Sequence, residues 1–396
     1  MTATTPAPAA APASRRAVLG ALGGALLTGG AASAAHAAPA APAARRRRPH
    51  PLQEHLDHLV HEVGFPSALA AVRDADGRTR DLTASRVGPV PVDGRVRAGS
   101  NTKTFVAVLL LQLAAEGRLD LDGPVDEHLP GVLRGASGDG RAVTVRQVLQ
   151  HTAGLPNYTA HFGTTDWTLL RDRYYEPREL LDLVRDVPAT AAPGERWEYS
   201  NTGYVVAGLI AQRVAGLPLA ELVRARITEP LGLRATFFPH PGEQGYRGPH
   251  PRAHHRDSSA LPWQDVTLLD PSWGWAAGAL VTTPSELNAF TLALLRGDLL
   301  PPAQLEQLRA TVPSPGDPWP GTRYGLGLSS SPLPDGALLW GHGGDIPGFE
   351  TRGGATEDGR AVQVAVTALP TAVAADEEGA LAAVGAVLDV VRAAFT

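Results

Sequence analysis

Residues 100–113 read SNTKTFVAVLLLQL, and this stretch decides the fold. Its apolar residues recur at helical spacing, so we predict a helix over residues 102–117 with one face formed by Val106, Leu109, Leu110 and Leu113. Strand-like sequence precedes the stretch, which places Ser100 at the start of the helix. Main-chain N–H groups and the positive end of the helix dipole meet at such a position, and both stabilise negative charge on a nearby oxygen.

Lys103 is the only lysine in the chain, although lysine and arginine together number 35. Arginine keeps its proton at accessible pH, whereas a buried lysine can lose it. Three positions after Ser100, Lys103 lies on the same helix face, where its amine can reach the serine hydroxyl. A neutral amine would accept the hydroxyl proton, and a charged amine would stabilise the alkoxide. The alternative is an N-cap serine followed by an exposed lysine.

Two further short motifs carry groups that suit catalysis. Residues 199–201 read YSN, and residues 341–344 read GHGG after a predicted strand. A tyrosine hydroxyl can pass protons, and an asparagine amide can both donate to a substrate carbonyl and accept from a lysine. Small residues beside a strand edge let a substrate backbone approach closely. Taken singly, the first motif also fits a turn before a helix, and the second fits an ordinary glycine loop.

Strands are predicted towards both ends of the chain, with helices between them. The expected strands cover residues 68–72, 79–84, 325–328, 337–340 and 362–368, and the expected opening and closing helices cover residues 52–63 and 377–395. Residues 118–270 have a mainly helical pattern broken by proline and glycine. This order predicts an α+β fold with an inserted helical lobe. A cleft between two lobes is a usual place for a functional site.

Composition excludes several function classes. The chain has 396 residues, 43% of them apolar, no cysteine and a net charge of −5. Thiol catalysis, disulfides and cysteine-bound metals are therefore excluded, and nucleic acid is not an expected partner. No Gly-x-Ser-x-Gly elbow or phosphate-binding Gly-x-x-x-x-Gly-Lys loop is present. His250, His254 and His255 cluster in a proline-rich loop, but no carboxylate pattern completes a metal site, so we expect no metal and no cofactor.

Residues 1–37 are predicted to be an export signal. Paired Arg15 and Arg16 precede an apolar, glycine-rich stretch, small residues surround Ala37 at the expected cleavage site, and the pattern resembles a twin-arginine signal. An uncleaved membrane anchor is less favoured, because the stretch is shorter than the ~20 residues that a span needs. We predict a Pro/Ala/Arg-rich linker at 38–50, a folded domain at 51–396, and a secreted protein without a stable membrane span in its mature form.

The three motifs occur in the order and approximate spacing of those in the serine β-lactamase and penicillin-binding protein superfamily. Within it, the chain resembles the class C β-lactamase-like group over about residues 52–396 and looks closest to soluble D-alanyl-D-alanine carboxypeptidases. Supporting stretches are EGRLDL at 116–121, VLQHTAGL at 148–155, EPLGL at 229–233, AGA at 277–279 and YGLGL at 324–328. The resemblance implies an antiparallel β-sheet flanked by N- and C-terminal helices, with the helical lobe at roughly 118–270.

The resemblance also implies acyl transfer and the residues that perform it. Ser100 would be the nucleophile, and Lys103 and Tyr199 would share the proton transfers. The N–H groups of Ser100 and Asp345 would form the oxyanion hole. The implied substrate-binding residues are Asn201, His342, Gly343, Gly344 and Asp345. The expected protein is a monomer that acts without a cofactor on a small molecule or peptide, such as a peptidoglycan stem peptide or a β-lactam.

Two departures from the family pattern leave the substrate open. Gly343 stands where a threonine hydroxyl usually helps to bind a substrate carboxylate, and Ser329 stands where related carboxypeptidases carry an arginine. Arg352 is a candidate substitute, and His342 could supply a positive charge or a hydrogen bond. The favoured function is a D-alanyl-D-alanine carboxypeptidase. The alternatives are a β-lactamase or esterase on the same scaffold, and a penicillin-binding sensor that stays acylated.

Overall fold

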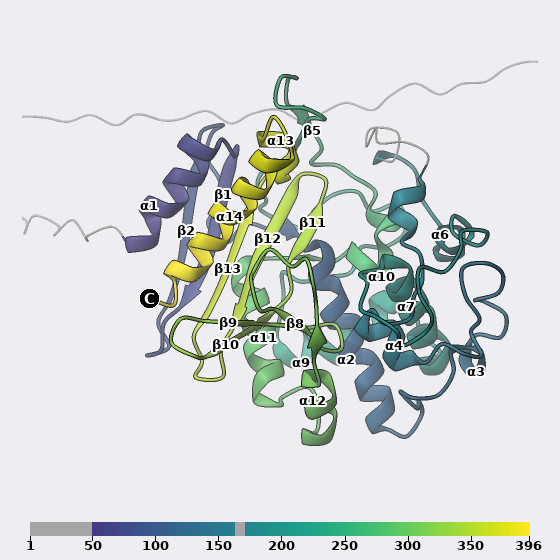
Figure 1. The fold of residues 1–396 in the computed structure, drawn as a ribbon. Coiled ribbons are helices and arrows are strands. Elements are labelled where there is room, and N and C mark those ends of the chain that lie inside the picture. Colours follow the sequence, from purple (N-terminus) through teal and green to yellow (C-terminus); the bar gives the residue numbers. More distant parts are fainter. Residues whose placement is uncertain (1–49, 163–170) are drawn as a thin grey trace, which may run out of the picture. The chain divides into compact units, whose positions relative to one another are not determined.

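An antiparallel sheet forms the centre of the computed structural model, which describes residues 50–162 and 171–396 (Figure 1). The strand order is β2-β1-β13-β12-β10-β9-β8-β7, and β11 pairs with β12 outside this path. The strands of this sheet are β1 Ser67–Arg73, β2 Thr79–Ser85, β7 Val312–Pro313, β8 Arg323–Tyr324, β9 Ser329–Pro332, β10 Leu338–Gly341, β11 Gly344–Ile346, β12 Phe349–Ala355 and β13 Ala361–Val366. Two small ladders pair β3 Val96–Arg97 with β6 Val281–Thr282, and β4 His254–His255 with β5 Gln264–Asp265.

Helices cover both faces of the sheet (Figure 1). The first and last helices, α1 and α14, pack on one face of the sheet. Helix α11 packs on the other face, which is the side of the mainly helical region. The helices are α1 Pro51–His58, α2 Thr102–Ala115, α3 Val125–His128, α4 Val145–Gln150, α6 Pro177–Asp182, α7 Asn201–Ala215, α8 Leu219–Val223, α9 Glu229–Leu231, α10 Trp275–Gly278, α11 Pro284–Arg296, α12 Pro302–Arg309, α13 Pro370–Val373 and α14 Glu377–Ala393. The predicted α+β class and antiparallel sheet are confirmed.

Two apolar cores follow from this layering. The smaller core lies between the sheet and the helices α1 and α14, and includes Leu56, Val364 and Val391. The larger core surrounds α2, whose residues from Thr102 to Leu111 are all buried. A helix that is apolar on every side belongs in a core. The single apolar face predicted for this segment therefore understated its burial, and the rigid surroundings fix the end of the helix that carries Ser100.

Most predicted elements are confirmed, and the last turn of the first helix is π-helical rather than α-helical. The predicted helix at 52–63 is found as α1 followed by a π-helical turn, Leu59–Val63, which ends at Gly64 with a φ of 101°. The strands expected at 68–72, 79–84, 337–340 and 362–368 correspond to β1, β2, β10 and β13. The closing helix is α14.

The strand predicted at 325–328 is wrong. These residues form a turn between β8 and β9, closed by the hydrogen bond from the Gly325 N–H to the Leu328 carbonyl at 2.8 Å. Gly327 has a φ of 76° and packs against α2, where the Thr104 hydroxyl donates to its carbonyl at 2.6 Å. The glycines therefore serve close packing on α2 rather than an extended strand.

Of the N-terminal predictions, the signal at 1–37 and the linker as far as residue 49 lie outside the described residues. The boundary of the helical lobe stays a prediction. In the described ranges, no single helix is long and apolar enough to cross a membrane, and one pair bent by 77°, Asn201–Ala215 with Leu219–Leu231, passes that test by length and composition alone.

Candidate active site

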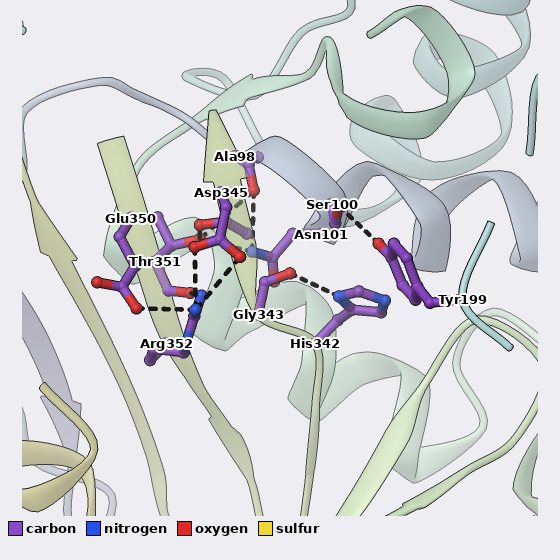
Figure 2. Close-up of polar contacts among 11 residues, drawn as sticks. Ala98, Ser100, Asn101, Tyr199, His342, Gly343, Asp345, Glu350, Thr351 and Arg352 are labelled. Carbon is purple, nitrogen blue, oxygen red and sulfur yellow. Dashed lines mark hydrogen bonds and ion pairs between the residues drawn. The ribbon is translucent and has the colours of Figure 1, made fainter. Parts of the chain in front are cut away.

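Ser100 lies in the tight turn Gly99–Asn101 that connects β3 to α2. Gly99 adopts a φ of +52°, and a Cβ added to it would lie 2.8 Å from the main-chain nitrogen of Asp345. This turn is also tied to β12, because the Asn101 amide donates to the Thr351 hydroxyl at 2.8 Å and to the Ala98 carbonyl at 3.0 Å (Figure 2). The turn and strand β11 are thus held in contact, with the Asp345 nitrogen beside the serine turn.

The Lys103 side chain is fully buried and reaches three oxygen atoms. Its Nζ lies 2.8 Å from Ser100 Oγ, 2.7 Å from Asn201 Oδ1 and 2.8 Å from the Ala277 carbonyl oxygen. Burial lowers the pKa of Lys103 well below its usual value, although the Asp345 carboxylate opposes the shift. Burial therefore favours the uncharged form of this amine.

The contacts of Lys103 decide what a neutral amine can do. The Ala277 carbonyl and the Asn201 side-chain oxygen have no hydrogen to give, so they accept both N–H bonds of a neutral amine. The remaining lone pair then faces Ser100 Oγ, where it can accept the hydroxyl proton. The predicted convergence of Ser100 and Lys103 is present, with the lysine buried rather than exposed at an N-cap.

Tyr199 lies just before helix α7, and its side chain points at Ser100 (Figure 2). Its hydroxyl donates to Ser100 Oγ at 2.8 Å. One part of the ring borders open space, but the phenol is packed among other groups, and burial raises its pKa above the usual value. The tyrosine therefore keeps its proton in the resting site and acts as a hydrogen-bond donor to the serine.

Asn201 is the first residue of α7, and the loop at 156–159 holds it in place. Its main-chain N–H donates to Asn157 Oδ1 at 3.1 Å, and the next residue, Thr202, donates its hydroxyl to the Pro156 carbonyl at 2.6 Å. Because the Asn201 Oδ1 accepts from Lys103, its amide nitrogen is turned to the border of the open site, where one N–H reaches the Thr159 hydroxyl at 3.5 Å. An N–H group at this place can donate to a substrate carbonyl.

The third motif contributes a neutral histidine. His342 Nδ1 lies 2.5 Å from the Gly343 carbonyl, so Nδ1 carries the hydrogen, and Nε2 accepts from the Tyr324 hydroxyl at 3.0 Å. Burial, followed by the charge of Lys103, lowers the pKa of His342 to about 3. Of the two roles left open for His342, a positive charge or a hydrogen bond, the positive charge is excluded by the lowered pKa, and both ring nitrogens form hydrogen bonds inside the protein.

The glycines of this motif make room for the protein itself. A Cβ on Gly344 would lie directly against the Ala98 carbonyl oxygen, and one on Gly343 would lie 2.9 Å from a guanidinium nitrogen of Arg352. Gly344 is buried, whereas Gly343 borders the open site. The close approach inferred from these small residues is an approach by the chain's own strands, and contact with a substrate stays a prediction.

Arg352 is enclosed by two carboxylates (Figure 2). Its Nη2 lies 2.9 and 3.2 Å from the two oxygens of Asp345 and 2.8 Å from Glu350 Oε1, where no N–H is aligned for a hydrogen bond. Nη1 donates to the Thr351 carbonyl at 2.9 Å. Burial alone would lower the pKa of Arg352, but Asp345 and Glu350 outweigh it and raise the pKa. Glu350 is fully buried, and burial raises its pKa to about 7.

Two hollows open on either side of Ser100. Hollow A, about 310 Å³, extends past Trp197, Trp319, Tyr324, His342 and Arg352. Hollow B, about 210 Å³, is lined by Tyr158, Thr159, Trp273, Ala277, Ile346 and Pro347. Ser100, Asn201 and Asp345 border both hollows. A carbonyl group placed at the serine would therefore have its two substituents in different surroundings.

The Beta-lactamase family profile matches residues 52–386. The chain belongs to this family. It is a serine hydrolase of the β-lactamase and penicillin-binding protein kind, so the predicted superfamily is confirmed.

Solved structures similar to this β-lactamase-family chain include two amide hydrolases. A D-stereospecific amidohydrolase from Streptomyces sp. is 38% identical, with a TM-score of 0.76 and coverage of 84% of this chain and 97% of that one. A D-amino acid amidase from Ochrobactrum anthropi SV3 is 26% identical, with a TM-score of 0.72 and coverage of 87% and 98%.

Curated relatives match over shorter segments. Esterase EstB from Burkholderia gladioli is 35% identical over 171 residues, which are 41% of this chain and 43% of the esterase. Penicillin-binding protein 4* from Bacillus subtilis is 26% identical over 284 residues, which are 68% of this chain and 59% of that protein. The chain thus spans less than two thirds of the length of either relative.

Several groups at the site of this β-lactamase-family chain were not assigned a role from sequence. The Ala277 carbonyl, Asn157, Thr351 and His151 fix the catalytic candidates through main-chain or side-chain contacts. Two signals pointed to them: Ala277 and His151 lie in stretches that resemble the family, and Asn157 is one of only four asparagines. In the part of the chain that the structure describes, no group of three or more His, Cys, Asp or Glu residues could hold a metal ion.

Proposed function

We propose that this chain hydrolyses amide or ester bonds of D-configured amino-acyl substrates through an acyl-enzyme on Ser100. The chemistry rests on the contacts at Ser100 Oγ, where an amine and a phenol both lie at 2.8 Å. The D-configured amide substrate is suggested by the similarity to a D-stereospecific amidohydrolase over 84% of the chain.

In the first step, Lys103 takes the hydroxyl proton as Ser100 Oγ attacks the substrate carbonyl. The negative oxygen that forms receives hydrogen bonds from the main-chain N–H groups of Ser100 and Asp345, which lie on the touching turn and strand. Losing one donor of this kind typically costs about 3–4 kcal/mol of barrier stabilisation. Asn201 donates to the carbonyl oxygen on the acyl side of the substrate.

Tyr199 completes the step by giving its proton to the departing nitrogen or oxygen as the bond to the carbonyl carbon breaks. The Lys103 ammonium then passes its extra proton directly to the tyrosinate, because both side chains flank Ser100 Oγ at 2.8 Å and the acylated oxygen itself carries no proton. Water then attacks the acyl-enzyme and releases the carboxylic acid, and the serine regains its hydrogen. Each group therefore ends the cycle in its starting protonation state.

Electrostatics in hollow A favour a leaving group without a carboxylate. Arg352 is the one guanidinium among the described residues that line this hollow, and it is already paired with Asp345 and Glu350. His342 is neutral, and Asp317 adds a further acid. A terminal carboxylate would have to displace Asp345 from Arg352, whereas an amide or ester would not.

The test is a substrate panel with the purified full chain. We expect faster release of ammonia from D-phenylalanine amide than from L-phenylalanine amide, and slower release of D-alanine from diacetyl-L-lysyl-D-alanyl-D-alanine. Mass spectrometry of the protein during turnover should detect the acyl-enzyme. Equal rates for the two enantiomers would overturn the stereochemical part, and an inactive panel with no adduct would overturn the proposal.

A D-alanyl-D-alanine carboxypeptidase is the second candidate, because Arg352 in hollow A is a cation that could bind a substrate carboxylate once Asp345 is displaced from it. If a substrate carboxylate replaces Asp345 at the guanidinium, D-alanine release will exceed amide hydrolysis in the same panel. Nitrocefin turnover would instead point to a β-lactamase, and a stable adduct without turnover to a penicillin-binding sensor.

We further propose that residues 1–37 direct export by the twin-arginine route, on the strength of Arg15 and Arg16 before the apolar stretch. A reporter fused to residues 1–37 should leave the cytoplasm only in cells with an intact twin-arginine translocase. Replacing both arginines by lysine should keep the reporter in the cytoplasm. Export of the reporter in cells that lack the translocase would contradict the proposal.

A further inference from the structure

His151 lies beneath the ring of Tyr199, at the end of helix α4. Its φ of 60° and ψ of 33° place it in the left-handed region, which ends the helix. The side chain is 2% exposed, and its ring centroid is 4.3 Å from that of Tyr199 at a tilt of 40°. The chemistry proposed above gives His151 no part, although it is the buried imidazole nearest to the tyrosine.

Three consecutive residues are held by this one side chain and its carbonyl group. The His151 carbonyl accepts from the Glu198 N–H at 2.8 Å. Its Nδ1 accepts from the Ser200 N–H at 3.2 Å. Between these two anchors, Tyr199 rests with its ring against the imidazole. Both peptide neighbours of the tyrosine, and the tyrosine ring itself, are therefore fixed by contacts with His151.

The hydrogen bond from the Ser200 N–H to His151 Nδ1 requires a neutral imidazole with one defined tautomer. Because Nδ1 accepts a hydrogen bond, the ring hydrogen must be on Nε2, which has no hydrogen-bond partner among the described residues. Burial lowers the pKa of His151 well below its usual value, so the ring is neutral. A buried donor without a partner is costly, and an apolar residue would avoid that cost. The imidazole therefore contributes something at this position that an apolar side chain cannot.

We propose that His151 is a positioning residue that sets the Tyr199 hydroxyl at hydrogen-bonding distance from Ser100. The inference rests on the proposed role of Tyr199 as proton donor to the leaving group. A displacement of about 1 Å at such a group can cost ~10²-fold in rate. A displaced Tyr199 hydroxyl should lower the rate most for substrates whose leaving group needs the donated proton.

The test compares two substrates that differ in this dependence. The nitrogen that leaves an amide is a strong base and a poor leaving group, so it needs the proton from Tyr199. The p-nitrophenolate that leaves the ester is a stable anion and needs no proton. His151→Phe keeps a ring beneath the tyrosine but removes the Nδ1 acceptor. His151→Asn keeps an acceptor close to the Nδ1 position and tolerates a positive φ, but loses the ring. Both variants are made in the full chain and compared with Tyr199→Phe.

We expect His151→Phe to lower kcat on the amide by about 10- to 100-fold, with a much smaller effect on the ester. His151→Asn should recover part of the amide activity. Combined with Tyr199→Phe, neither substitution should lower amide turnover further, because both act through the same hydroxyl. Gln147→Ala is the matched control: it removes the capping bond to the Thr144 N–H at the other end of α4, and should lower the melting temperature without changing the amide-to-ester ratio.

The outcomes separate the two levels of the proposal. If Tyr199→Phe shows no difference between amide and ester, the proposed role of the tyrosine fails. If Tyr199→Phe shows the difference but the His151 variants lower both substrates equally, or add their losses to those of Tyr199→Phe, His151 is a packing residue and the inference fails.

Discussion

Replacing Lys103 with arginine separates proton transfer from charge. The side chain is fully buried, and its amine contacts Ser100 Oγ, Asn201 Oδ1 and the Ala277 carbonyl within 2.8 Å. Arginine keeps a positive charge and several N–H donors in this position. It cannot accept a proton at any accessible pH, because its pKa lies above 12.

The expected loss follows from the role of the amine. General-base catalysis contributes typically about 10²- to 10⁴-fold, which corresponds to about 3–5 kcal/mol of activation free energy. The larger guanidinium also has to fit among groups that are already in contact, and overpacking costs typically about 1–3 kcal/mol of stability. We therefore expect an acylation rate reduced by at least two orders of magnitude in Lys103→Arg, with a folded but less stable protein.

The assay is the burst of p-nitrophenol released in the first turnover of a p-nitrophenyl ester, which reports acylation directly. Lys103→Met is the matched control, since it removes the amine and keeps the length of the side chain. A base role predicts that the arginine and methionine variants are equally slow. An arginine variant within tenfold of the natural enzyme, or far faster than the methionine variant, would refute the proton-accepting role. In the natural enzyme, acylation should rise with pH through the lowered pKa of Lys103.

Three further outcomes follow from buried groups. Lys103 regains its usual pKa in the unfolded chain, which therefore binds a proton that the folded chain lacks. The free energy of unfolding of the natural chain, measured by urea titration relative to Lys103→Met, should consequently rise with pH up to about 10. Gly344→Ala should press against Ala98, shift β11 and lower acylation by about 10²- to 10³-fold, while Gly385→Ala, which meets nothing within 4 Å in α14, should leave activity unchanged in the same assay. The pKa of Glu350 is raised to about 7 in the folded chain, so between the unfolded pKa and pH 7 the folded chain binds a proton that the unfolded chain lacks, and the free energy of unfolding falls as pH rises. Glu350→Gln should remove this pH-dependent loss, which amounts to up to about 3 kcal/mol. An unchanged slope of stability against pH in Glu350→Gln would contradict the burial argument.

Local sequence signals predicted the elements of the fold that have strong periodicity. The helices at both ends, the hairpin of β1 and β2, and the core helix α2 follow from apolar spacing alone. Strands β11 and β12 were not predicted from the sequence, because β12 contains Glu350, Thr351, Arg352 and two glycines and so shows no alternation of apolar and polar residues. Their pairing is fixed by tertiary contacts with the turn at Ser100, which a local pattern does not contain.

The site was predictable in its reactive groups and not in its electrostatics. A lone lysine three residues after a serine pointed to Ser100 and Lys103, and the YSN motif added Tyr199 and Asn201. The charge state of His342 depends on Tyr324 and on the Gly343 carbonyl, which only folding brings together. Likewise, the pairing of Arg352 with Asp345 and Glu350 depends on the register of β11 against β12.

The central claim is that one oxygen atom, that of Ser100, carries the acyl group during turnover. The direct measurement is peptide mapping by mass spectrometry after acid quench of the enzyme reacting with a p-nitrophenyl ester. We predict the acyl mass on the peptide that contains Ser100, and neither label nor turnover in Ser100→Ala. Turnover with that peptide unmodified, or a label on a different residue, would contradict the account.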